Sequence, residues 1–175
     1  LKRFLELPNG IPSHDTIRRL FMRISPGVFQ QKFCEWMAGI AKLHEGEIVA
    51  IDGKTLRRSH DKSNGKSAIH MVSAFARENG VVIGQVKVDE KSNEITAIPR
   101  LLDVLQITGC IVTLDAMGCQ SKIAEKIIEK QADYVMGLKG NQGKLLEDVT
   151  THFDTTSEES FDTFESTDGD HGRIE

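Results

Sequence analysis

Two aspartates in this sequence follow stretches that have the composition of buried strands. Asp52 comes directly after Ile48–Ile51, and Asp115 comes directly after Cys110–Leu114. Both stretches are apolar without alternation, which is typical of central strands covered on both faces. If the two strands are parallel neighbours, both carboxylates lie at the same edge of the sheet. Two close carboxylates repel each other unless they share a proton or a cation, so the pair predicts a metal site.

The expected ligands of this site are carboxylate oxygens alone. Oxygen ligands favour hard cations, so the predicted metal is Mg²⁺ or Mn²⁺. Either aspartate by itself is weak evidence, because Asp commonly begins turns. The prediction therefore depends on the topology that brings the two strands together.

The segment before Asp52 has the spacing of helices. Ser13 is a candidate cap for one helix, and Ser25 followed by Pro26 is the start expected of a second helix. Apolar residues recur at helical spacing from Val28 to Ile40, which favours a core or docking surface over a ligand site. Residues 1–46 are therefore predicted to be a helical N-terminal segment.

The segment after Asp52 first predicts strands and then alternating helices and strands. Strands are expected at 67–76 and 81–88, joined by a tight Asn79-Gly80 turn, and the polar link 55–66 is expected to be a mobile loop. The remaining expected elements are helix 93–105, strand 110–114, helix 121–130, strand 134–138 and a helix capped by Asn141. Pro99 is compatible with its helix only in the first turn.

The predicted order β-β-β-α-β-α-β-α specifies an α/β fold. A right-handed β-α-β crossover returns each later strand parallel to the same sheet. The result is a mixed five-stranded sheet, three antiparallel strands and then parallel strands, with flanking helices. The core is expected at residues 47–154. Residues 155–175, rich in Ser, Thr, Asp and Glu, are expected to form an acidic loop and the start of an inserted β-segment.

Composition limits the classes of protein to consider. The chain has 175 residues, 39% hydrophobic and 27% charged, with no apolar run long enough to span a membrane. Its net charge of −4 combines a mildly basic body with a strongly acidic C-terminal stretch. The three cysteines form no C-x-x-C pair, which indicates a reducing, cytoplasmic location. Because it begins with Leu1, we expect the chain to be a piece of a longer protein.

Basic residues after the first and the last predicted strands are candidates for contacts with phosphate groups. The candidates are Lys54, Arg57, Arg58, Lys62 and Lys66 in the link after the first strand, and Lys139 and Lys144 after the last strand. A solvated loop explains the first group equally well. His60 and His70 do not have the spacing of metal ligands.

Six strings in order resemble the insertion-sequence transposases of the DDE class, in particular the H-repeat-associated branch. They are GIPSHDTIRRLF, IDGKTLRRS, KSNEITAIPRLLDVL, TLDAMGCQ, YVMGLKGNQ and DHGRIE, and they extend from about Gly10 to Glu175. The resemblance implies an RNase H-like catalytic core, with Asp52 and Asp115 as the first and second catalytic acids. It also implies two Mg²⁺ or Mn²⁺ ions, with double-stranded DNA, both transposon ends and target, as the partner. An oligomer on DNA is compatible with it.

The sequence departs from the family at the third acid. A segment similar to H-W-x-I-E-N, which carries the family's glutamate, does not occur here. We expect the third acid beyond the C-terminus, and Glu175 is the alternative candidate. This fragment is accordingly expected to bind metal poorly and to cut DNA little. In the intact enzyme, the resemblance implies that water nicks the transposon end and that the freed 3′-hydroxyl attacks target DNA.

Three other functions compete with this hypothesis. An RNase H-like nuclease or resolvase would share the core without strand transfer, and a catalytically dead DNA-binding remnant would lack the third acid. An ATPase is disfavoured because the string GLKGNQGK from Gly137 has Leu138 and Leu145 where a P-loop requires Gly and Ser or Thr. Metal-dependent joining of transposon-end DNA distinguishes the transposase from the others.

Overall fold

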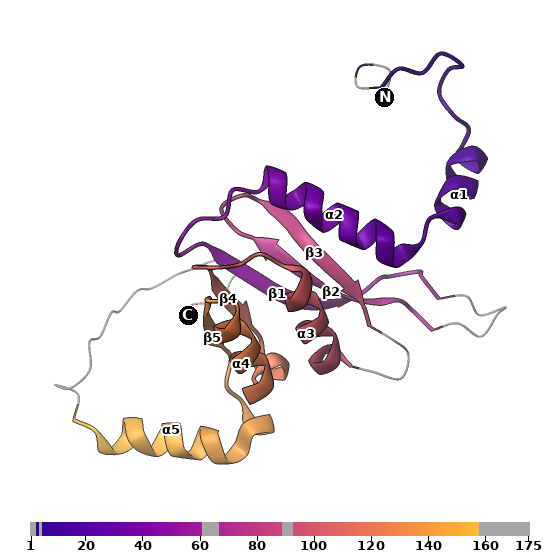
Figure 1. Cartoon of the computed structure of the whole chain (residues 1–175). Coiled ribbons are helices and arrows are strands. Elements are labelled where there is room, and N and C mark those ends of the chain that lie inside the picture. The colour runs from indigo at the N-terminus through magenta and orange to yellow at the C-terminus, as the bar shows by residue number, and fades with distance from the viewer. Residues whose placement is uncertain (1–2, 4, 61–66, 89–92, 158–175) are drawn as a thin grey trace, which may run out of the picture. The chain divides into compact units, whose positions relative to one another are not determined.

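A computed structural model describes residues 3, 5–60, 67–88 and 93–157 of the chain (Figure 1). The chain divides into two compact units, Leu1–Gly137 and Leu138–Glu175. Each unit is described by itself below. The predicted divisions at residues 46 and 154 stay predictions. No helix in the described part of the chain has the length and apolar character needed to cross a membrane.

The N-terminal segment is helical, as its spacing indicates. Helix α1 (His14–Arg23) is capped by Ser13, whose side chain accepts a hydrogen bond from the Thr16 N–H. Helix α2 (Pro26–Ile40) follows the cap residue Ser25 and has Pro26 at its first position. No residue of α1 is buried, whereas α2 buries Cys34 and Met37. Of these two helices, therefore, only α2 contributes to the core of the first unit.

A single mixed sheet forms the centre of the first unit. Its strands are β1 (Ile48–Thr55), β2 (His70–Ala76), β3 (Val81–Lys87), β4 (Ile111–Leu114) and β5 (Asp133–Met136). Their order across the sheet is β3-β2-β1-β4-β5. The pairs β1–β2 and β2–β3 are antiparallel, whereas β1–β4 and β4–β5 are parallel. The predicted five-stranded mixed sheet is confirmed, including β4 as the parallel neighbour of β1.

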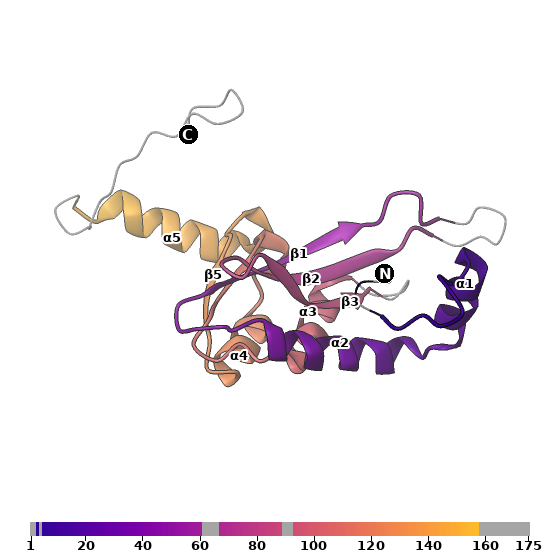
Figure 2. The same ribbon diagram turned by 90° about the horizontal axis from the view of Figure 1, so that it is seen from above.

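Three helices pack on one face of this sheet. Helix α3 (Glu94–Val104) lies on β2 and β3, α4 (Ser121–Glu129) lies beside α3 and β5, and α2 contacts β3. Figure 2 shows α2, α3 and α4 on the same side of the strands. The second unit contains a 3₁₀ turn (Gly140–Gln142) and α5 (Gly143–Thr155).

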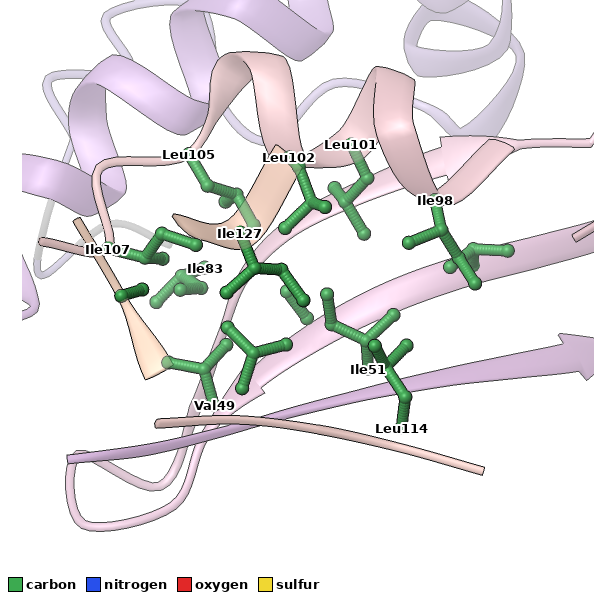
Figure 3. Close-up of a cluster of buried hydrophobic side chains, with 14 of the residues drawn as sticks. Val49, Ile51, Ile83, Ile98, Leu101, Leu102, Leu105, Ile107, Leu114 and Ile127 are labelled. Carbon is green, nitrogen blue, oxygen red and sulfur yellow. The ribbon is translucent and has the colours of Figure 1, made fainter. Parts of the chain in front are cut away.

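The hydrophobic core lies between the sheet and these helices. Strand residues such as Val49, Ile51 and Leu114 point toward Leu101 and Ile127 of the helices (Figure 3). Val49, Leu101 and Ile127 are completely buried. Because side chains alternate along a strand, the residues between them lie on the opposite face.

That opposite face is not covered by any helix of the described residues of Leu1–Gly137. Its side chains include Ala50, Ser73 and Thr113, which are half-buried, and Phe75 and Val135, which are 40% and 61% exposed. The prediction that β1 and β4 are covered on both faces is thus wrong within this unit. Short β-branched strands at the centre of a sheet are apolar on both faces, so composition alone did not reveal the open face.

A buried carboxylate holds the start of β1 to the β2–β3 turn. Glu47 is the buried charged residue of the described core, with 0% of its surface exposed. The Asn79 side chain donates to both Glu47 oxygens at 2.9 and 2.8 Å, and the Asn79 backbone N–H donates at 3.2 Å. Burial alone would raise the pKa of Glu47, but the hydrogen bonds from Asn79, together with His44 and the Glu78 backbone, outweigh it and leave the pKa below its usual value.

An exposed histidine extends this cluster. His44 Nε2 lies 2.7 Å from Glu78 Oε2 and 3.7 Å from Glu47 Oε2. The hydrogen bond to the Glu45 carbonyl, and then the bond to Glu78, raise the pKa of His44. The Asn79-Gly80 turn, predicted from its sequence, is therefore also an anchor for β1.

Three local predictions differ from the structure. Pro99 lies well inside α3, whose first residue is Glu94, so the first-turn requirement is wrong. The buried face of α3 compensates for the hydrogen bond that proline cannot donate. The cap of α5 is Gln142 instead of Asn141, because a 3₁₀ turn precedes the helix.

The third difference concerns the link 55–66. Thr55 is the last residue of β1, and the Leu56 N–H donates to the Ile69 carbonyl at 2.8 Å. Ser59 Oγ accepts from the Ile69 N–H at 2.7 Å. The start of the predicted mobile loop is thus a continuation of the β1–β2 hairpin. Residues 61–66 lie outside the described residues.

Candidate active site

The two aspartates directly follow the last paired residues of two adjacent parallel strands. The register of β1 and β4 places Ile51 beside Leu114, so the next residues, Asp52 and Asp115, are also neighbours. Adjacent strands are about 4.8 Å apart, so the two backbones lie within the distance that one cation bridges. Alternation from buried Ile51 and Leu114 places both carboxylates on the open face. The parallel neighbouring strands predicted for this pair are therefore present.

The Asp115 carboxylate is fixed by the turn that follows β4. Its Oδ1 accepts hydrogen bonds from the N–H groups of Met117 at 3.0 Å and Gly118 at 3.3 Å. Gly118 is buried, and a Cβ added there would lie 2.9 Å from a Leu114 methyl carbon. The glycine in DAMG thus allows the turn to close under the aspartate. Within the described residues, Oδ2 accepts no hydrogen bond.

The Asp52 carboxylate is exposed and has a different environment. The register places it opposite Ser73 of β2. Within the described part of the chain, no hydrogen bond or ion pair reaches this carboxylate. Since β4 ends at Leu114, the segment from Asp52 to Thr55 extends beyond its parallel neighbour. Asp52 is consequently free to bind a ligand, and its position depends on what holds that extension.

This pair fits part of a site for a hard divalent cation. Two exposed carboxylates on one face supply the oxygen ligands that Mg²⁺ and Mn²⁺ prefer. Among the residues that the structure describes, no group of three or more His, Cys, Asp or Glu is placed to hold a metal. The alternative third acid, Glu175, lies outside the described residues.

The structure describes some of the residues that are predicted to contact phosphate groups, and the others lie outside the described residues. Lys54, Arg57 and Arg58 are exposed on the β1–β2 hairpin just beyond Asp52, and Arg58 has a positive φ of 63°. Lys62 and Lys66 lie outside the described residues, and Lys139 and Lys144 are exposed residues of the second unit. The hairpin therefore carries at least three cations next to the pair.

Sequence analysis missed a polar row on the open face. The register places Ser73 and Gln85 in line with Asp52, and Met71 and Lys87 in line with Lys54. Gln85 and Lys87 are exposed. The signal in the sequence was the alternation of Gln85 and Lys87 with buried Val86, which predicts one polar face on β3.

Sequence analysis also missed a network on the covered face, directly behind Asp52. His70 Nε2 lies 2.5 Å from Glu94 Oε1, and His70 Nδ1 lies 2.9 Å from Thr55 Oγ1. A Cβ added to Gly53 would lie 2.1 Å from Glu94 Oε1, so this carboxylate rests on the backbone of Gly53. His70 and Glu94 are 29% and 17% exposed. These residues come from β1, β2 and α3, so no local spacing in the sequence could reveal them.

Comparison with known families identifies the chain. A family model described as the transposase DDE domain matches residues 43–173, which hold the sheet and both aspartates. The chain belongs to the DDE transposase family. A second model, described as associated with that domain, matches residues 1–37. With the strand order β3-β2-β1-β4-β5, this membership confirms the predicted RNase H-like fold class.

Relatives of this DDE transposase domain confirm the predicted H-repeat branch. The chain is 50% identical to the Escherichia coli K12 protein named Putative transposase YncI, covering 100% of the chain and 71% of that protein. It is 47% identical to the H repeat-associated putative transposase YhhI of the same strain, covering 100% of the chain but 47% of that protein. The chain therefore spans less than half the length of some relatives.

A comparison with solved structures gives a more distant similarity. The cryo-EM structure of the piggyBac transposase synaptic complex with hairpin DNA has a TM-score of 0.43 and 12% sequence identity. The similarity covers 68% of this chain and 27% of that chain.

Proposed function

We propose that this chain is the core of an insertion-sequence transposase that cuts and rejoins DNA strands, with Asp52 and Asp115 as two of its catalytic acids. One observation carries the proposal. The two aspartates directly follow the paired residues Ile51 and Leu114 at the carboxyl ends of adjacent parallel strands, and both are exposed. Family membership supports the same chemistry, since phosphoryl transfer by two metal ions requires such a cluster of carboxylates.

Asp52 and Asp115 would hold the divalent ions, Mg²⁺ or Mn²⁺. When bound, such ions stabilise the charge on a phosphoryl group and lower the pKa of coordinated water. The chain itself contributes fixed geometry. Asp115 keeps one oxygen bonded to the backbone of its own turn, which leaves the other oxygen for a ligand. No covalent bond between protein and DNA is needed.

Double-stranded DNA, as transposon ends and as target, is the proposed substrate. Lys54, Arg57 and Arg58 on the hairpin, with Lys87 in line with Lys54 on the open face, would contact phosphates beyond Asp52. Lys62, Lys66, Lys139 and Lys144 remain proposed contacts of the same kind. Since a transposon has two ends, we propose that more than one copy of the chain acts on the DNA. The proposed location is the cytoplasm.

The proposal assigns the third acid to a segment that the described residues do not include. The two carboxylates alone form an incomplete site, so the chain by itself should bind metal weakly and cleave little. The same observation favours a second candidate function, a DNA-binding remnant without catalysis. The two candidates differ in whether cleavage appears once a third acid is supplied.

The test uses this sequence extended by the C-terminal segment of YhhI that lies beyond the matched region. Cleavage and joining are measured on DNA that carries insertion-sequence ends, with Mn²⁺ present. The variants Asp52→Asn and Asp115→Asn are compared with Asp133→Asn as a matched control. Asp133 is exposed on the same open face, opposite Ile111 at the other end of β4. Four residues of strand, about 13 Å, separate it from the site.

The proposal predicts that both site variants lose cleavage by at least about 100-fold, as expected when a catalytic metal ligand is lost, and keep DNA affinity within a few-fold. The control should cleave like the unmutated protein. Cleavage that survives in either site variant refutes the assignment of the acids. DNA binding with no cleavage by the unmutated protein refutes the transposase and supports the remnant.

A further inference from the structure

We infer that Glu94 and His70 are positioning residues for Asp52, acting through the backbone of Gly53. The inference rests on the proposed function, because it concerns how one of the proposed metal ligands is held. It adds two residues from β2 and α3 to a site otherwise built from the ends of β1 and β4. Neither residue faces the open side where the metal and the DNA would bind.

The first observation is the contact between Glu94 and Gly53. A Cβ at residue 53 would lie 2.1 to 2.7 Å from three atoms of the Glu94 carboxyl group, so any larger residue there would displace the Glu94 side chain. Gly53 has no positive φ, so its backbone conformation does not explain the glycine. The glycine of the IDGK string is therefore explained by the carboxylate that lies on it.

The second observation is that His70 connects this carboxylate to β1. One ring nitrogen of His70 contacts Glu94, and the other contacts the hydroxyl of Thr55. Thr55 and His70 also face each other across the β1–β2 ladder. The contacts run from Gly53 to Glu94, then to His70 and then to Thr55. They connect the two neighbours of Lys54 on the covered side of the sheet.

The third observation is that this part of β1 has little other support. Beyond Ile51 the strand has no paired residue in β4, so its remaining ladder partner is β2. Asp115 has its own support in the turn of Met117 and Gly118. Each aspartate thus has a separate device that fixes its backbone, and the network of Glu94 and His70 is the device for Asp52.

A purely structural role is the alternative. Glu94 lies in the first turn of α3, where a negative charge stabilises any helix, and an imidazole commonly pairs with such a charge. In that role the Glu94 side chain need not contact Gly53, and its removal would not change the affinity of an ion at Asp52. The contact with Gly53 and the effect on a bound ion therefore separate the two roles.

The experiment uses the full 175-residue chain and four variants: Gly53→Ala, Glu94→Ala, Glu94→Gln and the double variant Gly53→Ala with Glu94→Ala. Three quantities are measured for each variant. They are stability to urea, hydrogen exchange of the Lys54 amide, and Mn²⁺ affinity by electron paramagnetic resonance. Lys54 is chosen because its amide belongs to the β1–β2 ladder, opposite Met71. In an antiparallel ladder every second residue makes the hydrogen bonds to the partner strand. The Leu56 N–H donates to Ile69, so the Lys54 amide, two residues earlier, is hydrogen-bonded as well.

Lys126→Ala is the matched control for loss of an ion pair on α3. Lys126 contacts Asp103 at 2.7 Å near the other end of that helix. Its removal should leave the Lys54 amide and the Mn²⁺ affinity unchanged within about twofold, because an exposed pair contributes little.

The inference makes four predictions for the site variants. Gly53→Ala destabilises the unmutated chain but has no further effect when Glu94 is alanine, because the clash is gone. Glu94→Ala speeds exchange of the Lys54 amide by about tenfold or more while core amides are unchanged. It also weakens Mn²⁺ binding by about tenfold, the usual effect of losing a residue behind a metal ligand. Glu94→Gln, which keeps the shape, stays within about threefold of the unmutated chain on the same basis.

Two results would overturn the inference. One is an equal cost of Gly53→Ala with and without the Glu94 side chain. The other is a Glu94→Gln variant that binds Mn²⁺ as weakly as Glu94→Ala, which would mean that charge alone acts. If the chain extended by the C-terminal segment of YhhI binds no Mn²⁺, the proposed function fails, whereas the stability cycle and the Lys54 amide still decide the positioning role.

Discussion

Replacing Asn79 by alanine should show how strongly the start of β1 depends on a single buried hydrogen-bonding partner. The Asn79 side chain donates to both oxygens of Glu47, which has 0% exposure. Each hydrogen bond to a charged group contributes about 1.5 to 3 kcal/mol, and breaking a buried charge pair costs about 3 to 5 kcal/mol. One backbone bond to Glu47 remains in the variant. We therefore expect Asn79→Ala to lower the free energy of unfolding by about 3 kcal/mol.

The same reasoning predicts a smaller effect where the charge has been removed. Glu47→Gln leaves a neutral amide that still accepts one bond from Asn79, so it should cost about 1 kcal/mol. In that background Asn79→Ala no longer strands a charge and should also cost about 1 kcal/mol. The coupling between the two residues is then about 2 kcal/mol, within the range for residues in direct contact.

Urea unfolding of the four proteins measures these values, with an unchanged slope on denaturant as the check that the native state is intact. A cost of Asn79→Ala below about 1 kcal/mol would mean that water reaches Glu47 and replaces the lost bonds. An equal cost in both backgrounds would contradict the view that the stranded charge dominates.

Three further predictions concern pH, the core and DNA. The folded-state pKa of Glu47 lies below the ordinary 4.5, so its contribution to stability is present above that value and is lost as pH falls through the folded pKa. The folded-state pKa of His44 lies above the ordinary 6.5, so its contribution is present below that value and is lost as pH rises through the folded pKa. Urea unfolding across a pH series should show both losses, and His44→Ala should remove the second and lessen the first, because His44 also lowers the pKa of Glu47. Leu101→Ala, at a fully buried position, should cost about 2 to 5 kcal/mol by the same assay. Lys87→Glu should weaken DNA binding and reduce its salt dependence in a filter-binding assay, whereas Lys122→Glu, on the outer side of α4, should not.

The sequence alone was sufficient for the topology, including the neighbouring strands β1 and β4 that Asp52 and Asp115 follow. The strand at Cys110–Leu114 and the helix before it predicted a right-handed crossover, and this places Asp115 next to Asp52. The tight turn at Asn79-Gly80 likewise followed from local residue chemistry. These predictions use the residue pattern within each segment and general rules for how neighbouring segments connect.

The features that were missed depend on contacts between distant parts of the chain. The reason for Gly53 is the carboxylate of Glu94, and the partner of His70 lies on α3, so neither follows from spacing. Pro99 is tolerated because packing of its helix outweighs a lost hydrogen bond. The Glu47–Asn79 pair was hidden because a glutamate before a strand has no distinguishing pattern.

The central claim is that Asp52 and Asp115 bind one cation together. Its most direct test adds Mn²⁺ to the ¹⁵N-labelled chain and follows paramagnetic broadening of amide signals around both residues. We expect signals around Asp52 and around Asp115 to broaden at the same Mn²⁺ concentration, and Asp52→Asn to protect both sets. Broadening around one aspartate alone, or broadening around Asp115 that Asp52→Asn leaves unchanged, would contradict the shared site.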